Sequence, residues 1–325
     1  MRPVAATWVL FLALLSPIGT VSASDAEAPR KMLERMSAAM SQMSYQGTFV
    51  YLQGDAVETM RITHIADRAG VRERLVALSG PSREVLRDSS GVRWVLSDDR
   101  SVFEDAAFDR PFFPKLPFDQ YDQTEISYSL KKGPKARIAG HNAQNLKVLP
   151  RDQYRYGYSL WLEEHSGLLL KWELLGNKGE PLAKLMFTEV KLGAEVDSSE
   201  LKPSSQLKKF KTVESKLPSG HGLSQTPPKW QPSSVPSGFK LTAHRYSAGA
   251  EKDVYEHLVY SDGLAAVSVY VESIPAENTI PTGSRQLGTT HAYSRTSDDV
   301  MITVVGDVPA ITVKLIGNNV EVTAP

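Results

Sequence analysis

Cysteine is absent from all 325 residues of the chain. Its absence excludes disulfide bonds, iron–sulfur clusters, thiolate zinc sites and cysteine nucleophiles. A surplus of basic charge is also missing, because 37 Lys and Arg residues are balanced by 37 Asp and Glu residues. Nucleic-acid binding depends on such a surplus, so the composition predicts no nucleic-acid partner.

Signatures of catalytic and cofactor sites are missing too. The seven His residues lie singly, without the HExxH spacing of a zinc site. No nucleophile elbow, P-loop or dinucleotide-binding glycine motif occurs in the sequence. Two S-x-x-K matches, at Ser129 and Ser205, lack the companion motifs of a serine hydrolase. We therefore predict a protein that is not an enzyme and has no catalytic residues, no metal and no cofactor.

Only one long apolar run is present, at residues 4–18, between Arg2 and the small residues at 21–23. This order is typical of a secretory signal peptide that is cleaved after the small residues. A membrane anchor is the alternative, but the run is shorter than the ~20 residues that a bilayer requires. We interpret residues 1–23 as a signal peptide and predict export, which suits a chain without thiols.

The mature chain begins with a helical pattern and continues with strands. Asp25 and Pro29 are typical of a helix start, and apolar residues then recur at helical spacing as far as Ser44. The predicted helix contains four Met residues, which suit either a core or an adaptable apolar pocket. Strands with period-two alternation are predicted at 48–52, 60–66, 72–78, 84–87, 92–97, 127–131, 136–139, 145–150, 155–163, 168–175 and 182–192. So few helical segments predict an antiparallel meander and exclude a doubly wound fold.

Residues 104–123 interrupt the strands with prolines and aromatic residues. Proline excludes a central strand here, and so many aromatic side chains favour apolar contacts over water. Both a plug that completes the core and a gate over a ligand site fit this composition. The candidate gate residues are Phe108, Phe112, Phe113 and Phe118.

Residues 201–229 are rich in Lys, Pro and Ser, which is typical of a linker, although a contact with anionic lipid also fits the Lys run. Beyond the linker we expect strands at 239–244, 254–261, 265–273, 289–296 and 300–306, then a helix from Pro309 to Ile316 that Gly317 ends. The predicted domains are therefore 24–200 and 230–325, the second a small α+β domain.

Strand alternation places a set of apolar residues on one face of the first sheet. They are candidates for the lining of an apolar cavity, although each is equally explained as plain core. The candidates are Phe49, Tyr51, Ile62, Trp94, Leu96, Tyr158, Leu160, Leu162, Leu170, Trp172 and Leu174.

Seven segments, in order along the chain, resemble the RseB/MucB family of periplasmic regulators of the extracytoplasmic-stress sigma factor. They are 45–51 (YQGTFVY), 80–85 (GPSREV), 136–140 (ARIAG), 150–157 (PRDQYRYG), 230–239, 260–264 (YSDGL) and 302–309. The segment 150–157 is more similar to the MucB branch than to the enterobacterial one.

This resemblance implies a β-rich α+β fold. The first domain would be a large, LolA-like curved antiparallel sheet, or half-barrel, with helices and an apolar cavity, followed by a smaller α+β C-terminal domain. It also implies a periplasmic protein that grips the periplasmic region of a membrane anti-sigma factor of the MucA/RseA type. Bound there, the regulator would shield the anti-sigma factor from a site-1 protease of the DegS/AlgW type, and lipid or lipopolysaccharide would release it. A homo-oligomer remains open.

The predicted second sheet suggests where a partner segment docks. Val267, Val269 and Val271 share one face, and Ser268, Tyr270 and Glu272 share the other. An exposed aromatic side chain gives contact area at little entropic cost, so the candidate anti-sigma contacts are Tyr255, His257 and Tyr270. A solvated sheet face is the alternative.

Two other classes of function stay open. A periplasmic carrier of lipid or lipoprotein would share the first fold, but carriers of that type usually lack a second domain. A hydrolase with an unrecognised site would be revealed by turnover of an acyl or glycosyl substrate.

Overall fold

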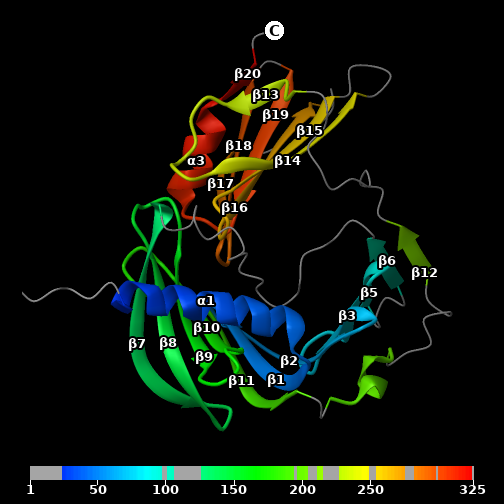
Figure 1. The fold of residues 1–325 in the computed structure, drawn as a ribbon. Coiled ribbons are helices and arrows are strands. Elements are labelled where there is room, and N and C mark those ends of the chain that lie inside the picture. The colour runs from blue at the N-terminus through cyan, green and yellow to red at the C-terminus, as the bar shows by residue number, and fades with distance from the viewer. Residues whose placement is uncertain are drawn as a thin grey trace, which may run out of the picture.

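The computed structural model describes residues 24–96, 101–105, 126–193, 196–203, 211–214, 227–248, 254–274, 282–297 and 299–323. Two sheets dominate these residues, and the smaller one stands over one end of the larger one (Figure 1). We call the first sheet with its helix the large unit, and the second sheet with its helix the small unit.

The large unit is built on a sheet of 12 strands in the order β12-β6-β5-β4-β3-β2-β1-β11-β10-β9-β8-β7. Neighbouring strands are antiparallel except β12, which runs parallel to β6. The strands are β1 Tyr45–Gln53, β2 Ala56–Asp67, β3 Gly70–Ala77, β4 Arg83–Asp88, β5 Gly91–Leu96, β6 Ser101–Asp105, β7 Tyr128–Ile138, β8 His141–Pro150, β9 Gly157–Glu163, β10 Leu169–Leu175, β11 Pro181–Leu192 and β12 Lys211–Glu214.

Strand β1 joins the two halves of this sheet, because it pairs with β2 on one side and with β11 on the other. Close packing at this seam requires glycine at position 47. A Cβ atom on Gly47 would lie 2.6 Å from the backbone oxygen of Glu189 and 2.7 Å from the Phe187 ring. The sheet therefore curves continuously across β1 (Figure 1).

Helix α1, Ser24–Gln42, crosses the concave face of the large sheet (Figure 1). Met32, Leu33 and Met36 are buried on its inner face, as the helical spacing of the apolar residues predicts. The predicted N-cap at Asp25 is wrong, because Ser24 and Asp25 already belong to the helix and Pro29 lies inside it. Capping preferences are local, and the packing of the apolar stripe outweighs them.

The small unit holds a sheet of six strands in the order β14-β15-β16-β19-β18-β17. Helix α3, Ala310–Asn318, packs on β18 and β19, and a short pair, β13 with β20, closes one end. The strands are β13 Trp230–Pro232, β14 Lys240–Ala248, β15 Val254–Ser261, β16 Ala266–Ser273, β17 Gly283–Leu287, β18 Thr290–Ser297, β19 Val300–Gly306 and β20 Val320–Val322.

The expected fold class is confirmed in its β-rich α+β character, its large curved antiparallel sheet and its smaller second sheet with a helix. The predicted end of α3 at Gly317 is wrong, because Gly317 lies inside the helix. A Cβ atom there would lie 2.6 Å from Cδ1 of Tyr293, so glycine lets the helix approach β18 closely. In the described part of the chain, no helix is long and apolar enough to span a membrane.

Two expectations about the strands of the large unit are also wrong. Strand β7 is continuous where two strands were expected around Gly133 and Pro134; the pairing register shifts between Lys132 and Lys135. Because β7 is an edge strand, a proline there removes no ladder hydrogen bond. In addition, β12 lies within the predicted linker. Its only β-forming residues are one Thr and one Val, and in a Lys-rich segment this pair is too short to predict a strand.

Candidate functional site

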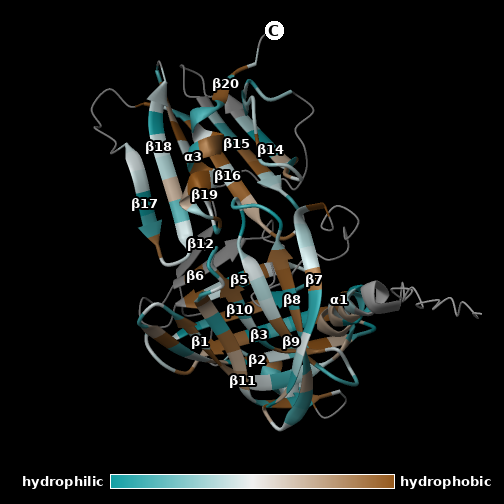
Figure 2. Ribbon diagram, turned by 90° about the vertical axis from the view of Figure 1, so that its left-hand side faces the viewer, coloured by the Kyte–Doolittle hydropathy of each residue, from teal (hydrophilic) through white to brown (hydrophobic). Residues whose placement is uncertain are grey.

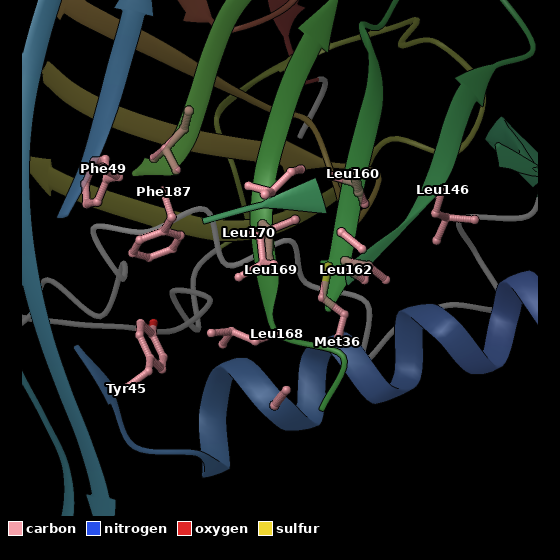
Figure 3. Close-up of a cluster of buried hydrophobic side chains, with 14 of the residues drawn as sticks. Met36, Tyr45, Phe49, Leu146, Leu160, Leu162, Leu168, Leu169, Leu170 and Phe187 are labelled. Atoms are coloured by element: carbon pink, nitrogen blue, oxygen red, sulfur yellow. The ribbon is translucent and has the colours of Figure 1, made fainter. Parts of the chain in front are cut away.

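An apolar surface on the concave face of the large sheet is the first candidate site. Helix α1 covers one part of it: Met36 points toward Leu162 and Leu168, while Tyr45, Phe49 and Phe187 pack alongside (Figure 3). The Phe49 and Phe187 rings meet edge to face with centroids 5.7 Å apart. The part under α1 is tightly filled core, so a ligand there would have to displace side chains.

Beyond the helix, the same face continues as a cluster of partly buried aromatic residues. Tyr51, Tyr158 and Trp172 pack there against Leu174 and Ala183. The rings of Tyr51 and Trp172 lie 6.2 Å apart. Burial, and then the charges of Asp262 and Asp307, raise the pKa of Tyr158. Because Asp262 and Asp307 belong to the small unit, this aromatic end of the face lies beneath it.

The structure brings the predicted cavity residues together on this one face. Phe49, Ile62, Leu160, Leu162, Leu170 and Leu174 are buried. Tyr51, Trp94, Tyr158 and Trp172 are only partly buried, which makes them the accessible members. The side chain of Leu96 and the predicted gate residues Phe108, Phe112, Phe113 and Phe118 lie outside the described residues.

The opposite face of the large sheet is polar in the same strands. Lys171 stacks its ammonium group over the Trp161 ring at 4.0 Å and pairs with Glu173 at 3.0 Å. Lys184 also approaches Glu173, at 3.6 Å. The alternation along β9, β10 and β11 thus separates an apolar concave face from a charged outer face. Figure 2 shows hydrophobic residues in brown and hydrophilic residues in teal following one another along the strands of the large sheet.

The outer face of the small sheet is the second candidate site. Val267, Val269 and Val271 point into the core, as predicted, and are fully buried. Along the other face, the strand register aligns Arg245, His257, Tyr270 and Thr303 in one row. The His257 and Tyr270 rings stack at 4.3 Å and 4°.

Tyr255 lies beside this row, opposite Glu272. Burial, followed by the nearby Tyr270 and Glu272, raises the pKa of Tyr255. The three predicted contact residues, Tyr255, His257 and Tyr270, are therefore neighbours on one half-exposed sheet surface. Such a surface offers stacking area and both signs of charge to an extended peptide.

Two buried carboxylates have structural partners. Glu73 accepts from His64 at 2.7 Å and from Arg87 at 3.1 Å. Glu256 meets His244 at 2.7 Å and accepts the backbone N–H groups of Lys229 and Trp230. Among the described residues no group of three His, Cys, Asp or Glu side chains could hold a metal ion. Each carboxylate is thus held by hydrogen bonds inside the core of its own unit.

The junction of the two units is a polar site that sequence reasoning missed. Arg155 is fully buried there and pairs with Asp262 of the small unit at 2.5 Å. Arg155 also donates to the backbone oxygen of Ser237 at 2.6 Å. The only sequence signal was the family-like segment 150–157, since an arginine at a strand end is ordinarily solvated.

The fold is that of a β-rich protein of two units, with an apolar concave surface on the large unit and a polar outer sheet face on the small unit. Residues 28–205 match the model of the MucB/RseB N-terminal domain, and residues 224–321 match that of the MucB/RseB C-terminal domain. The chain belongs to the MucB/RseB family, whose members are regulatory proteins of sigma factors.

Individual relatives agree with this assignment. The chain is 33% identical over 305 residues to "Sigma factor AlgU regulatory protein MucB" of Pseudomonas aeruginosa, covering 92% of both chains. It is 24% identical over 308 residues to "Sigma-E factor regulatory protein RseB" of Escherichia coli K12, covering 93% of both. The predicted greater similarity to MucB is confirmed by these identities.

Solved structures of MucB match as well. The complex of MucA and MucB from Pseudomonas aeruginosa superposes with a TM-score of 0.73 at 31% identity, covering 92% of this chain and all of that one. A crystal structure of MucB alone matches with a TM-score of 0.64 at 30% identity, covering 93% of this chain and 99% of that one. Both units are therefore part of the shared fold.

Proposed function

We propose that this protein is an exported, periplasmic regulator that binds the periplasmic region of a membrane anti-sigma factor of the MucA/RseA type and thereby restrains the envelope-stress sigma factor. The similarity to MucB across both units, including MucB in complex with MucA, is the observation that carries this proposal. Bound regulator would cover the anti-sigma factor and slow its cleavage by a site-1 protease.

The outer face of the small sheet supports a docking place for the partner. The row of Arg245, His257 and Tyr270 presents a stacked aromatic pair and a cation, with Glu272 in the next row. A disordered periplasmic segment can order itself along such a face, and aromatic anchors supply much of the binding energy.

The test is calorimetry of the mature chain with the periplasmic segment of the anti-sigma factor. Tyr270→Ala removes the stacked anchor, so we expect affinity to fall at least tenfold. Tyr246→Ala is the matched control, because Tyr246 is 39% exposed but alternates to the other face of β14. Equal losses in both variants would exclude this face, and no binding by the unchanged chain would overturn the proposed function.

We further propose that the aromatic end of the concave face binds an acyl chain of a lipid or lipopolysaccharide, which is the signal that releases the partner. Tyr51, Tyr158 and Trp172 support this, because they extend the apolar face and remain partly exposed. A carrier of lipid or lipoprotein is the alternative function, and the small unit with its aromatic row favours a regulator over a carrier.

The lipid proposal is tested with a fluorescent fatty acid. Trp172→Ala removes the largest partly exposed ring of the cluster, so we expect weaker binding by about tenfold. Trp161→Ala is the control, because this tryptophan of the neighbouring strand lies on the charged outer face under Lys171. Unchanged binding by Trp172→Ala, or an equal loss with Trp161→Ala, would contradict an acyl site on the concave face.

A further inference from the structure

The small unit contacts the large unit at one end of its sheet, through the turn before β18, through β18 itself and through α3. Gln53 donates to Thr289 at 2.9 Å, Thr312 donates to the backbone oxygen of Tyr154 at 2.6 Å, and Tyr156 meets His291 at 3.3 Å. These three contacts are partly exposed. The turn between β15 and β16, residues 262–265, makes a fourth contact that is buried.

Asp262 makes contacts both within the 262–265 turn and with the large unit. Its Oδ1 atom accepts the N–H groups of Leu264 at 2.8 Å and Ala265 at 2.7 Å, which fixes the shape of the turn. Its Oδ2 atom pairs with Arg155 at 2.5 Å and accepts from the hydroxyl of Tyr128 at 3.1 Å. One carboxylate therefore both shapes the turn and ties it to the large unit.

Arg155 is enclosed by side chains of both units. Its guanidinium carbon lies 5.5 Å from the Tyr128 ring centre and 5.0 Å from that of Phe239. Gly238, beside Phe239, has φ of +87°, and a Cβ atom there would lie 2.4 Å from Oγ of Ser127. The backbone at Gly238 therefore lies so close to the Ser127 side chain that any larger residue at this position would clash.

Leu264 is the tip of the turn, and it packs against the apolar core of the large unit. The same turn lies near Tyr158, because Asp262 accepts from Tyr128 of β7, and Leu130 of β7 and Tyr158 of β9 both pair with Val148 of β8. Leu264 of the small unit therefore packs on the large core beside the aromatic end of the concave face, where the partly exposed rings lie.

We propose that the 262–265 turn is an internal occupant of the acyl site: Leu264 covers the aromatic end of the concave face, and the Arg155–Asp262 pair holds it there. A bound acyl chain and the docked turn then exclude one another. This inference rests on the proposed lipid binding and adds its consequence. The apparent affinity for the ligand is then the intrinsic affinity multiplied by the fraction of molecules in which the 262–265 turn is undocked. Conversely, a bound ligand increases the fraction of molecules in which the small unit is loosened.

Two substitutions separate the role of the Leu264 side chain from the role of the Arg155–Asp262 pair. Leu264→Ala trims the covering side chain and keeps every contact of Asp262. Asp262→Asn keeps an oxygen for the turn and removes the charge that Arg155 needs. In each variant we expect a fluorescent fatty acid to bind at least tenfold more tightly than to the unchanged chain. Leu287→Ala and Asp88→Asn are controls, because Leu287 is 85% exposed and Asp88 pairs with Arg93 within the large unit.

A second readout follows the position of the small unit. Because the chain has no cysteine, Ala136→Cys with Val322→Cys gives one spin-label pair across the two units. We expect the distribution of distances between the two labels to broaden in Asp262→Asn, and also when fatty acid is added to the unchanged chain. Unaltered affinity in Leu264→Ala and Asp262→Asn, while the unchanged chain binds the probe, would overturn this inference alone. Failure of the unchanged chain to bind the probe would overturn the lipid function and the inference with it.

Discussion

Glu73 shows the energetic balance of a buried charge in this protein. Its carboxylate lies in the core of the large unit between His64 and Arg87, and His64 stacks on Tyr45 at 4.7 Å. Burial alone would raise the pKa of Glu73, but the hydrogen bonds and charges of His64 and Arg87 outweigh it and lower the pKa. The ionised form of Glu73 is therefore the form that stabilises the fold.

Replacing Glu73 with glutamine should destabilise the protein by about 3 kcal/mol at pH 7, because Arg87 loses its counter-charge and His64 loses a carboxylate hydrogen-bond partner in a buried site. A lowered folded pKa contributes stability that is complete above the ordinary value of 4.5 and is lost as the pH falls through the folded pKa. The difference between Glu73→Gln and the unchanged chain should therefore shrink below pH 4.5. Urea denaturation across pH measures it.

Glu34→Gln is the matched control for this prediction. Glu34 pairs with Arg30 one helical turn away, and its side chain is 54% exposed. An exposed pair of this kind contributes about 0.5 kcal/mol or less, so the loss should be small at every pH. A loss of the same size in both variants, or a Glu73→Gln effect that grows toward low pH, would contradict the assignment.

At the scale of elements, the alternation of apolar and polar residues predicted the strands that have one apolar and one polar face. It missed strands that lack two such faces. The period-two pattern in β16 places apolar residues in a core and polar ones outside, and the burial alternates with it. In β9 and β10 the two faces differ in composition, but the burial does not alternate strictly. Strand β17 was missed because all its residues are exposed and none reports an inner face. Strands β13 and β20 were missed because each spans only three residues.

The candidate sites could likewise be predicted from the sequence only in part. Which residues share the concave face could be predicted, because strand parity alone determines it. Which of them stay accessible could not, because that depends on where α1 and the small unit cover the sheet. Arg155 was missed for a related reason: its burial arises from Asp262, which lies 107 positions away in the sequence.

At the scale of the whole molecule, the two units have separate cores. They are joined by the buried Arg155–Asp262 pair, the buried hydrogen bond from Tyr128 to Asp262, the packing of Leu264 and a few partly exposed contacts. The core of the large unit is formed by α1 and the concave face, and that of the small unit by Phe239, the valines of β16 and α3. Of the chain between them, β12 pairs with β6 of the large unit, while Lys229 and Trp230 are bound by Glu256 of the small unit. The covalent division between the units therefore falls after Glu214 and before Lys229.

Limited proteolysis checks this division. Trypsin should cut at Lys216, the basic residue between these two anchored segments, before it cuts at Lys229, whose backbone N–H is held by Glu256 at 2.9 Å. We expect two resistant fragments, identified by mass spectrometry, that remain together on size-exclusion chromatography because the Arg155–Asp262 pair joins them without the linker. In Asp262→Asn the fragments should separate, since Arg155 then keeps only Asp152 of its own unit as a charged partner and the ion pair across the junction is lost. A single resistant core that spans Lys216, or fragments that separate equally in the unchanged chain, would contradict two units joined by this pair.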